Sequence, residues 1–242
     1  MGIRFFFQAE DGIRVRVTSR GLGNVYKGQL RYLGYKGQEF SSEINTLIEE
    51  CIKEIKTLVT LRATYKYFSV HINNQANLVD INLKLKGKDI LHHLEESNKC
   101  CVMAATLGSK VDRKILYYEK VNMTKAVILD ACATTAIEEY CDLIENEVKK
   151  EVEKDKLNIN WRYSPGYGDL DISIQRELLK SLDAERTIGL TVSSHNILIP
   201  RKSVTAIIGV IPKEVVVNKK SCSKCNKFSS CKFRKIGEIC EY

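Results

Sequence analysis

An amphipathic helix is the clearest pattern in the amino-acid sequence. Ser41 or Ser42 is a suitable N-cap for it, because a serine hydroxyl can accept a hydrogen bond from the first helical turn. Apolar residues then recur at spacings of three and four, which is the period of a helix with one buried face. This pattern predicts a helix over residues 44–59 and consists of Ile44, Leu47, Ile48, Cys51, Ile52, Ile55, Leu58 and Val59.

The longest helical pattern covers about residues 124–154. It begins with the apolar run Ala126 to Leu129 and ends in a highly charged stretch, Glu145 to Lys156. This change along the helix predicts one buried end and one end in solvent. Shorter helices are predicted over residues 89–96, 110–121 and 173–182.

Stretches that alternate, or that are rich in β-branched and aromatic residues, predict strands. They are residues 65–72, 78–85, 101–107, 158–163, 188–192, 197–199 and 203–210. Helices and strands are mixed along the chain without a regular βαβ repeat. This order predicts an α+β fold, in which a mixed or antiparallel twisted sheet carries several helices, one of them long.

The net charge of +8 lies at the two ends of the chain. Residues 1–30 hold five basic and two acidic side chains, residues 213–242 hold eight and three, and residues 31–212 hold 25 of each. A protein that binds nucleic acid usually carries its basic stripe on the folded surface. We therefore expect no nucleic-acid partner, with binding through the basic tail as the lesser alternative.

Residues 1–29 differ from the rest, with five glycines and no sustained period of either 2 or 3.6. They resemble translated sequencing-adapter peptides, and the alternative is a native basic arm. Under either interpretation we expect poor order.

No apolar run approaches the roughly 20 residues of a membrane helix, and no apolar leader is visible. We therefore expect a cytoplasmic protein without a membrane partner.

Four of the nine cysteines are close together near the C-terminus, in the pattern Cys222-x2-Cys225-x5-Cys231-x8-Cys240. Four thiolates with this spacing could hold Zn or an iron–sulfur cluster, and the lysines and arginines around them would offset their charge. Free, redox-active thiols are the alternative. The remaining cysteines are expected to fill the core, because free cysteine is among the most buried residue types: Cys51, Cys100, Cys101, Cys132 and Cys141.

The segment from Arg162 to Gly168, RYSPGYG, has the composition of a ligand-binding turn. Its proline and glycines permit a tight backbone path. Arg162 offers a fork suited to a carboxylate or phosphate, and a tyrosine could stack on a flat ring or a cation. The alternative is an ordinary strand-to-helix turn with one exposed arginine.

RYSPGYGD at 162–169 and SVTA at 203–206 together resemble the activation (reactivation) domain of cobalamin-dependent methionine synthase, in its short stand-alone form. The similarity covers about residues 30–242 and also involves LRYLGYKGQE at 30–39, CVMAATLGSKVDRKILYYEK at 101–120 and LDACATTAIEEYCDLIENEV at 129–148. The resemblance implies an activation domain over 30–212, followed by the cysteine-rich tail at 213–242.

The resemblance also implies a function. Such domains bind S-adenosylmethionine and support reductive methylation of cob(II)alamin, with an electron donor such as flavodoxin or ferredoxin. The Asp-x-His-x-x-Gly signature for binding cobalamin is not found in this sequence. The cobalamin is therefore expected on a separate methionine synthase or corrinoid methyltransferase module. We expect a component of methionine biosynthesis that is not a complete methyltransferase alone.

Carried over to matching positions, Arg162 would hold the carboxylate of S-adenosylmethionine. The backbone of Ser164, Gly166 and Tyr167 would line its adenosyl and methionine portions, and Glu138 would approach it from the long helix. The alternative for Glu138 is a solvated helix acid. Tyr163 and Gly168 depart from the family pattern. An alternative function is a metal or iron–sulfur module for electron transfer or interaction, with a vestigial ligand turn.

Overall fold

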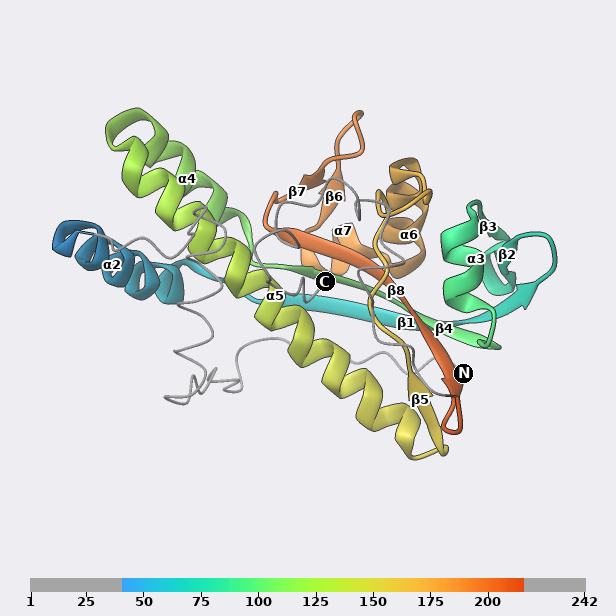
Figure 1. Ribbon diagram of the computed structural model, residues 1–242. Helices are drawn as coiled ribbons and strands as arrows, with labels where there is room; N and C mark the ends of the chain where they lie inside the picture. Colours follow the sequence, from blue (N-terminus) through green and yellow to red (C-terminus); the bar gives the residue numbers. More distant parts are fainter. Residues whose placement is uncertain (1–40, 216–242) are drawn as a thin grey trace, which may run out of the picture.

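The computed structural model describes residues 41–215. The lead at 1–29, the segment 30–40 and the four C-terminal cysteines lie outside these residues. Six strands form one antiparallel sheet in the order β3-β2-β1-β4-β8-β5 (Figure 1). Their bounds are β1 Arg62–Ile72, β2 Ala76–Leu78, β3 Leu83–Leu85, β4 Lys99–Thr106, β5 Leu157–Ile159 and β8 Ser203–Pro212. A separate two-stranded ribbon is formed by β6, Thr191–Val192, and β7, Leu198–Ile199.

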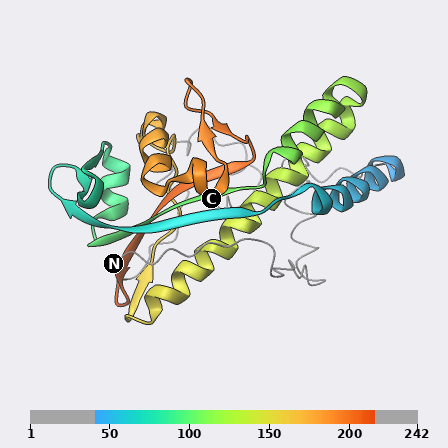
Figure 2. The same ribbon diagram turned by 180° about the vertical axis from the view of Figure 1, so that it is seen from behind.

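Both faces of the sheet are covered, which explains why β4 is buried from Cys100 to Thr106. Alternate residues of a strand point to opposite faces. Cys101 and Met103 accordingly pack with one layer of helices, and Cys100 and Val102 with the other. The first layer comprises α2 Ser42–Leu58, α4 Ser109–Val121 and α5 Met123–Glu153, and the second α3 Lys88–Leu94, α6 Gln175–Leu182 and α7 Ala184–Ile188. Figure 2 shows the same arrangement from behind.

Helix α5 is the predicted long helix, with 31 residues. Asn122 caps it by accepting a hydrogen bond of 3.0 Å from the amide of Lys125. The expectation that its charged end lies in solvent is wrong in part. Val148 and Val152 are buried in the core of this layer, because β5 folds back directly after the helix and brings this end onto the sheet. Within residues 41–215, no helix has both the length and the apolarity to cross a membrane.

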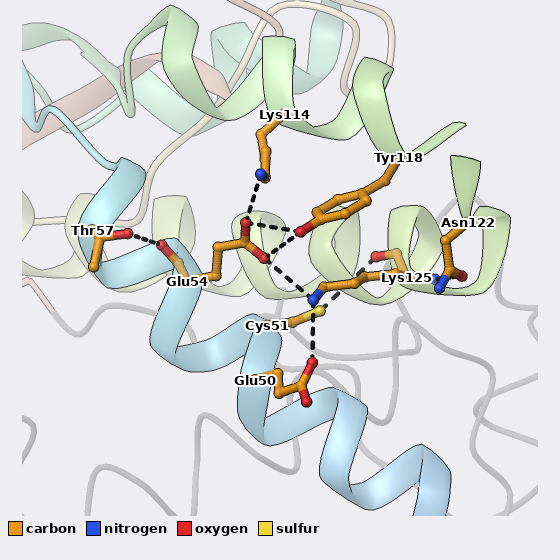
Figure 3. A network of polar contacts seen from close by, with 8 residues as sticks. All are labelled: Glu50, Cys51, Glu54, Thr57, Lys114, Tyr118, Asn122 and Lys125. Carbon is orange, nitrogen blue, oxygen red and sulfur yellow. Dashed lines mark hydrogen bonds and ion pairs between the residues drawn. The ribbon is translucent and has the colours of Figure 1, made fainter. Parts of the chain in front are cut away.

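A polar network joins the three helices of the first layer (Figure 3). The carboxylate of Glu54 on α2 accepts from the hydroxyl of Tyr118 on α4 at 3.0 Å. Lys114 lies 3.2 Å from the same carboxylate. Lys125 at the start of α5 lies 3.7 Å from Glu54 and 3.1 Å from Glu50. These contacts join α2, α4 and the beginning of α5 to one another.

Three strand predictions differ from the structure in detail. The predicted strand at 78–85 is two short strands around a 3-10 turn, Val79–Ile81, because Asn82 adopts a left-handed conformation with φ 49°. Ile188 ends α7 and does not begin a strand, since Gly189 at φ 69° terminates that helix. The predicted strand at 158–163 ends at Ile159.

The short β5 has a local cause in the following residue. The side-chain oxygen of Asn160 accepts a hydrogen bond of 2.6 Å from the backbone amide of Gly209, and the backbone amide of Asn160 donates to the Gly209 carbonyl at 3.0 Å. The side-chain oxygen of Asn160 therefore takes the place that a backbone carbonyl would have in a regular strand pair.

The five cysteines outside the tail are all buried, which confirms their predicted role in the core.

Candidate functional site

The predicted ligand turn begins where the chain leaves β5 and passes β8. Tyr163 forms a two-way backbone pair with Ile207: its amide donates at 2.9 Å, and its carbonyl accepts at 2.8 Å. In the described part of the chain, pairing along this edge of β8 stops at Ile207. The edge of residues 203–206, which includes the SVTA segment, therefore lies beyond the last pair and next to the turn.

Arg162 points from this turn onto helix α5. Its Nη1 lies 2.7 Å from Glu145 and 2.8 Å from Asp142, and its Nη2 lies 3.4 Å from Glu138. The three acids are spaced by four and three residues, so they share one face of the helix. The structure thus brings together two residues that the sequence analysis had singled out, Arg162 and Glu138. Asp142 and Glu145 were not predicted as site residues, although their helical spacing from Glu138 is visible in the sequence.

The guanidinium group remains charged in this setting. Its burial lowers the pKa of Arg162, but the electrostatic effects of Cys141, Glu145 and Asp142 outweigh burial, so the pKa is raised overall. The Arg162 side chain is only 18% exposed. One cation therefore faces three acidic side chains, and this excess of negative charge favours a ligand that carries positive charge.

Two backbone amides of the turn donate hydrogen bonds to carbonyls within the same segment. The amide of Gly166 donates to the carbonyl of Leu170 at 2.8 Å, and the amide of Tyr167 donates to the carbonyl of Ser164 at 3.0 Å. Gly166 adopts φ 88°, a conformation that suits glycine. Ser164, Gly166 and Tyr167 are thus held in a preformed loop, in which the two amides already have acceptors. These two amides therefore shape the loop and do not donate hydrogen bonds to a ligand.

Gly168, one of the departures from the family pattern, has a structural reason. Its φ is 52°, and a Cβ at this position would collide with the carboxylate of Asp89 and the hydroxyl of Tyr163. The next residue, Asp169, accepts hydrogen bonds from the amides of Lys88 and Asp89 at 2.6 and 3.2 Å. The turn is therefore fastened to the beginning of α3.

Aromatic side chains accompany the turn. The rings of Tyr163 and Tyr167 meet edge to face at 6.2 Å, and the ring of His93 lies 5.1 Å from Tyr163. Burial, and then the nearby Asp89 and Asp169, raise the pKa of Tyr163 to about 12. Tyr167 is 46% exposed, so part of its side chain lies at the surface of the turn.

A second cation contacts α5 at the other end of the unpaired edge of β8, residues 203–206. Lys202, directly before β8, lies 2.9 Å from Asp130 and donates to the hydroxyl of Thr134 at 2.8 Å. The SVTA segment that follows is also anchored, because the buried hydroxyl of Thr205 donates to Gln175 at 2.8 Å. Arg162 and Lys202 thus both form ion pairs with α5, one at each end of the unpaired edge of β8.

No protein-family model and no curated protein matches this sequence. Among solved structures, the crystal structure of the MetH reactivation domain bound to AdoHcy matches 98% of this chain and 86% of its own, with a TM-score of 0.61 and 11% identity. The chain folds like the MetH reactivation domain. At this identity the likeness concerns the fold, and it confirms the predicted α+β class with a long helix.

The predicted metal ligands stay a prediction, because Cys222, Cys225, Cys231 and Cys240 lie outside the described residues. In residues 41–215, no group of three or more histidine, cysteine or acidic side chains is arranged to hold a metal ion. The buried thiols there are poor ligands as they stand, because burial raises the pKa of Cys132 and of Cys141 to about 12.

Proposed function

We propose that this protein binds S-adenosylmethionine and presents its methyl group for the reductive methylation of cob(II)alamin on a separate methionine synthase or corrinoid methyltransferase. The observation that carries the proposal is the contact between Arg162 and Glu138 beside a preformed turn. It occurs in a chain that folds like the MetH reactivation domain. The sequence resemblance and the contact involve the same two residues.

The ligand's charges suit those of the site. S-adenosylmethionine carries a carboxylate, an ammonium and a sulfonium. Arg162 would bind the carboxylate, because a guanidinium matches its two oxygens. Glu138, at 30% side-chain exposure, would stabilise the positive groups. The turn of Ser164, Gly166 and Tyr167 would border the rest of the molecule.

The chemistry would occur on the partner's cobalt. One electron from a donor protein reduces Co(II) to Co(I), whose electron pair forms the Co–CH3 bond as the S–CH3 bond breaks, and S-adenosylhomocysteine leaves. The residues of this chain would hold and orient the methyl donor, which lowers the entropic cost of the encounter.

Calorimetric titration of the full 242-residue chain with S-adenosylmethionine tests the proposal. Arg162→Ala should weaken binding by at least about tenfold, because a hydrogen bond to a charged group contributes roughly 1.5–3 kcal/mol. Arg186→Ala is the matched control, since Arg186 is exposed and pairs with Asp183 three residues away. Equal affinities of wild type and Arg162→Ala would contradict the proposal.

A metal or iron–sulfur module for electron transfer or interaction is the second candidate. It is favoured by the four closely spaced cysteines from Cys222 to Cys240. On this alternative the turn would be vestigial, and the chain would contain metal while failing to bind S-adenosylmethionine. The calorimetric titration and a metal analysis together separate the two candidates.

A further inference from the structure

The three acidic partners of Arg162 are not equally exposed. The side chain of Asp142 is 64% exposed, whereas those of Glu138 and Glu145 are both 30% exposed. Arg162 itself is 18% exposed. Asp142 is thus the acid nearest to bulk water, and its contact with the guanidinium lies on the outer side of the cluster.

Nη1 of Arg162 is shared by two of these acids. It donates a hydrogen bond of 2.7 Å to Glu145 and lies 2.8 Å from Asp142 in an ion pair, and an Nη group has only two N–H bonds to donate. A ligand carboxylate that binds the guanidinium through both Nη atoms needs one of the N–H bonds on Nη1. Such a ligand therefore competes with Glu145 or Asp142 for the space and the charge at Nη1.

Asp142 is the acid that is easier to displace. An exposed ion pair contributes little to stability, because water solvates the separated charges almost as well. A more buried carboxylate loses more when its partner is removed. Glu145, together with Glu138, is therefore suited to keep the guanidinium in place while Asp142 turns out into solvent.

We propose that Asp142 is an exchangeable counterion, which the carboxylate of an amino-acid-bearing adenosyl ligand replaces on Nη1 of Arg162. The proposal rests on the S-adenosylmethionine site proposed above. It assigns to Asp142 a role in specificity: the residue competes with ligands through their carboxylate, and it attracts ligands that have only positive charge.

Calorimetry of the full chain with two ligands tests this role. Asp142→Asn should bind S-adenosylmethionine roughly two- to fivefold more tightly than wild type, which is the range that an exposed ion pair allows. The same variant should bind decarboxylated S-adenosylmethionine no more tightly, and up to severalfold more weakly, because that ligand gains nothing from the vacated N–H and loses a nearby negative charge. The sign of the change should therefore depend on the ligand's carboxylate.

Two further variants separate exchange from a general effect of charge. Glu139→Gln removes the same charge from the neighbouring turn of α5 without touching Arg162, and it should leave both affinities within about twofold of wild type. Glu145→Gln should weaken the binding of S-adenosylmethionine, because it loosens the anchored side of the guanidinium.

The outcomes also distinguish the two proposals. If wild type binds S-adenosylmethionine but Asp142→Asn binds it equally or less tightly, the counterion exchange is wrong and the site stands. Equal gains in Asp142→Asn and Glu145→Gln, or in Asp142→Asn and Glu139→Gln, would also overturn the exchange. If wild type does not bind the ligand at all, the proposed function fails, and the exchange fails with it.

Discussion

The hydroxyl of Tyr67 on β1 donates a hydrogen bond of 2.8 Å to Glu151 on α5. Tyr65, two residues earlier on the same face of the strand, donates to the other oxygen of this carboxylate at 3.0 Å. The two phenols thus bind one acid near the C-terminal end of the long helix. This contact holds the charged end of α5 against the sheet.

The contact predicts a loss of stability at alkaline pH. Burial, followed by Cys101 and the bond to Glu151, raises the pKa of Tyr67 well above its usual value. The folded state therefore retains this proton where the unfolded state releases it, so the stabilisation is present below about pH 10 and decreases as the pH rises further. Thermal unfolding should show a steeper fall in Tm between pH 9 and 11 for wild type than for Tyr67→Phe. Parallel pH profiles would contradict the assignment.

The backbone of the ligand turn predicts a strong effect of a single methyl group. Gly168→Ala should lower the free energy of unfolding by roughly 2–4 kcal/mol, since the left-handed conformation is strained for alanine and the new Cβ meets Asp89 and Tyr163. Gly166→Ala is the control, because its φ is also positive but its Cβ would have only ordinary contact with Ile172 at 3.7 Å. Urea denaturation should show the larger loss for Gly168→Ala, and equal losses would mean that the crowding at Gly168 has no energetic consequence.

The helical network predicts unequal contributions from two acids of α2. Glu54 is 20% exposed and has three partners, whereas Glu50 is 53% exposed and pairs with Lys125. Glu54→Ala should destabilise the chain by about 1–3 kcal/mol, because it leaves polar groups of Lys114 and Tyr118 without their acceptor. Glu50→Ala should cost less than about 1 kcal/mol. Chemical denaturation checks both values, and a ratio near one would show that burial of this network is unimportant.

The cysteine-rich tail predicts a bound metal. Protein purified without oxygen should contain either stoichiometric Zn or iron with a visible absorption band, and Cys222→Ser combined with Cys225→Ser should remove it. Ser223→Ala, between the two cysteines, is the control and should keep the metal. Metal-free wild-type protein with four titratable thiols in the tail would favour the free-thiol alternative.

The site was predictable in part. Arg162 and Glu138 were each predicted, from the family resemblance, to contact the ligand, and the structure brings their side chains to within 3.4 Å of each other. The roles of Asp142 and Glu145 became apparent only once the direction of the Arg162 side chain was known. Conversely, the backbone of Gly166 and Tyr167 was predicted to line the ligand, whereas their amides donate hydrogen bonds within the loop.

The sequence by itself determined the local elements and the fold class. The 3.6-residue period of α2, the long pattern of α5 and the apolar run of β4 each arise from contacts within one segment, so they can be recognised without the rest of the chain. The tertiary structure alone decided the strand order, the pairing of β4 with the distant β8, and the placement of the charged end of α5 on the sheet. These depend on which segments meet in space. The cluster around Arg162 depends on the same packing, because it requires α5 to pass beside the turn after β5.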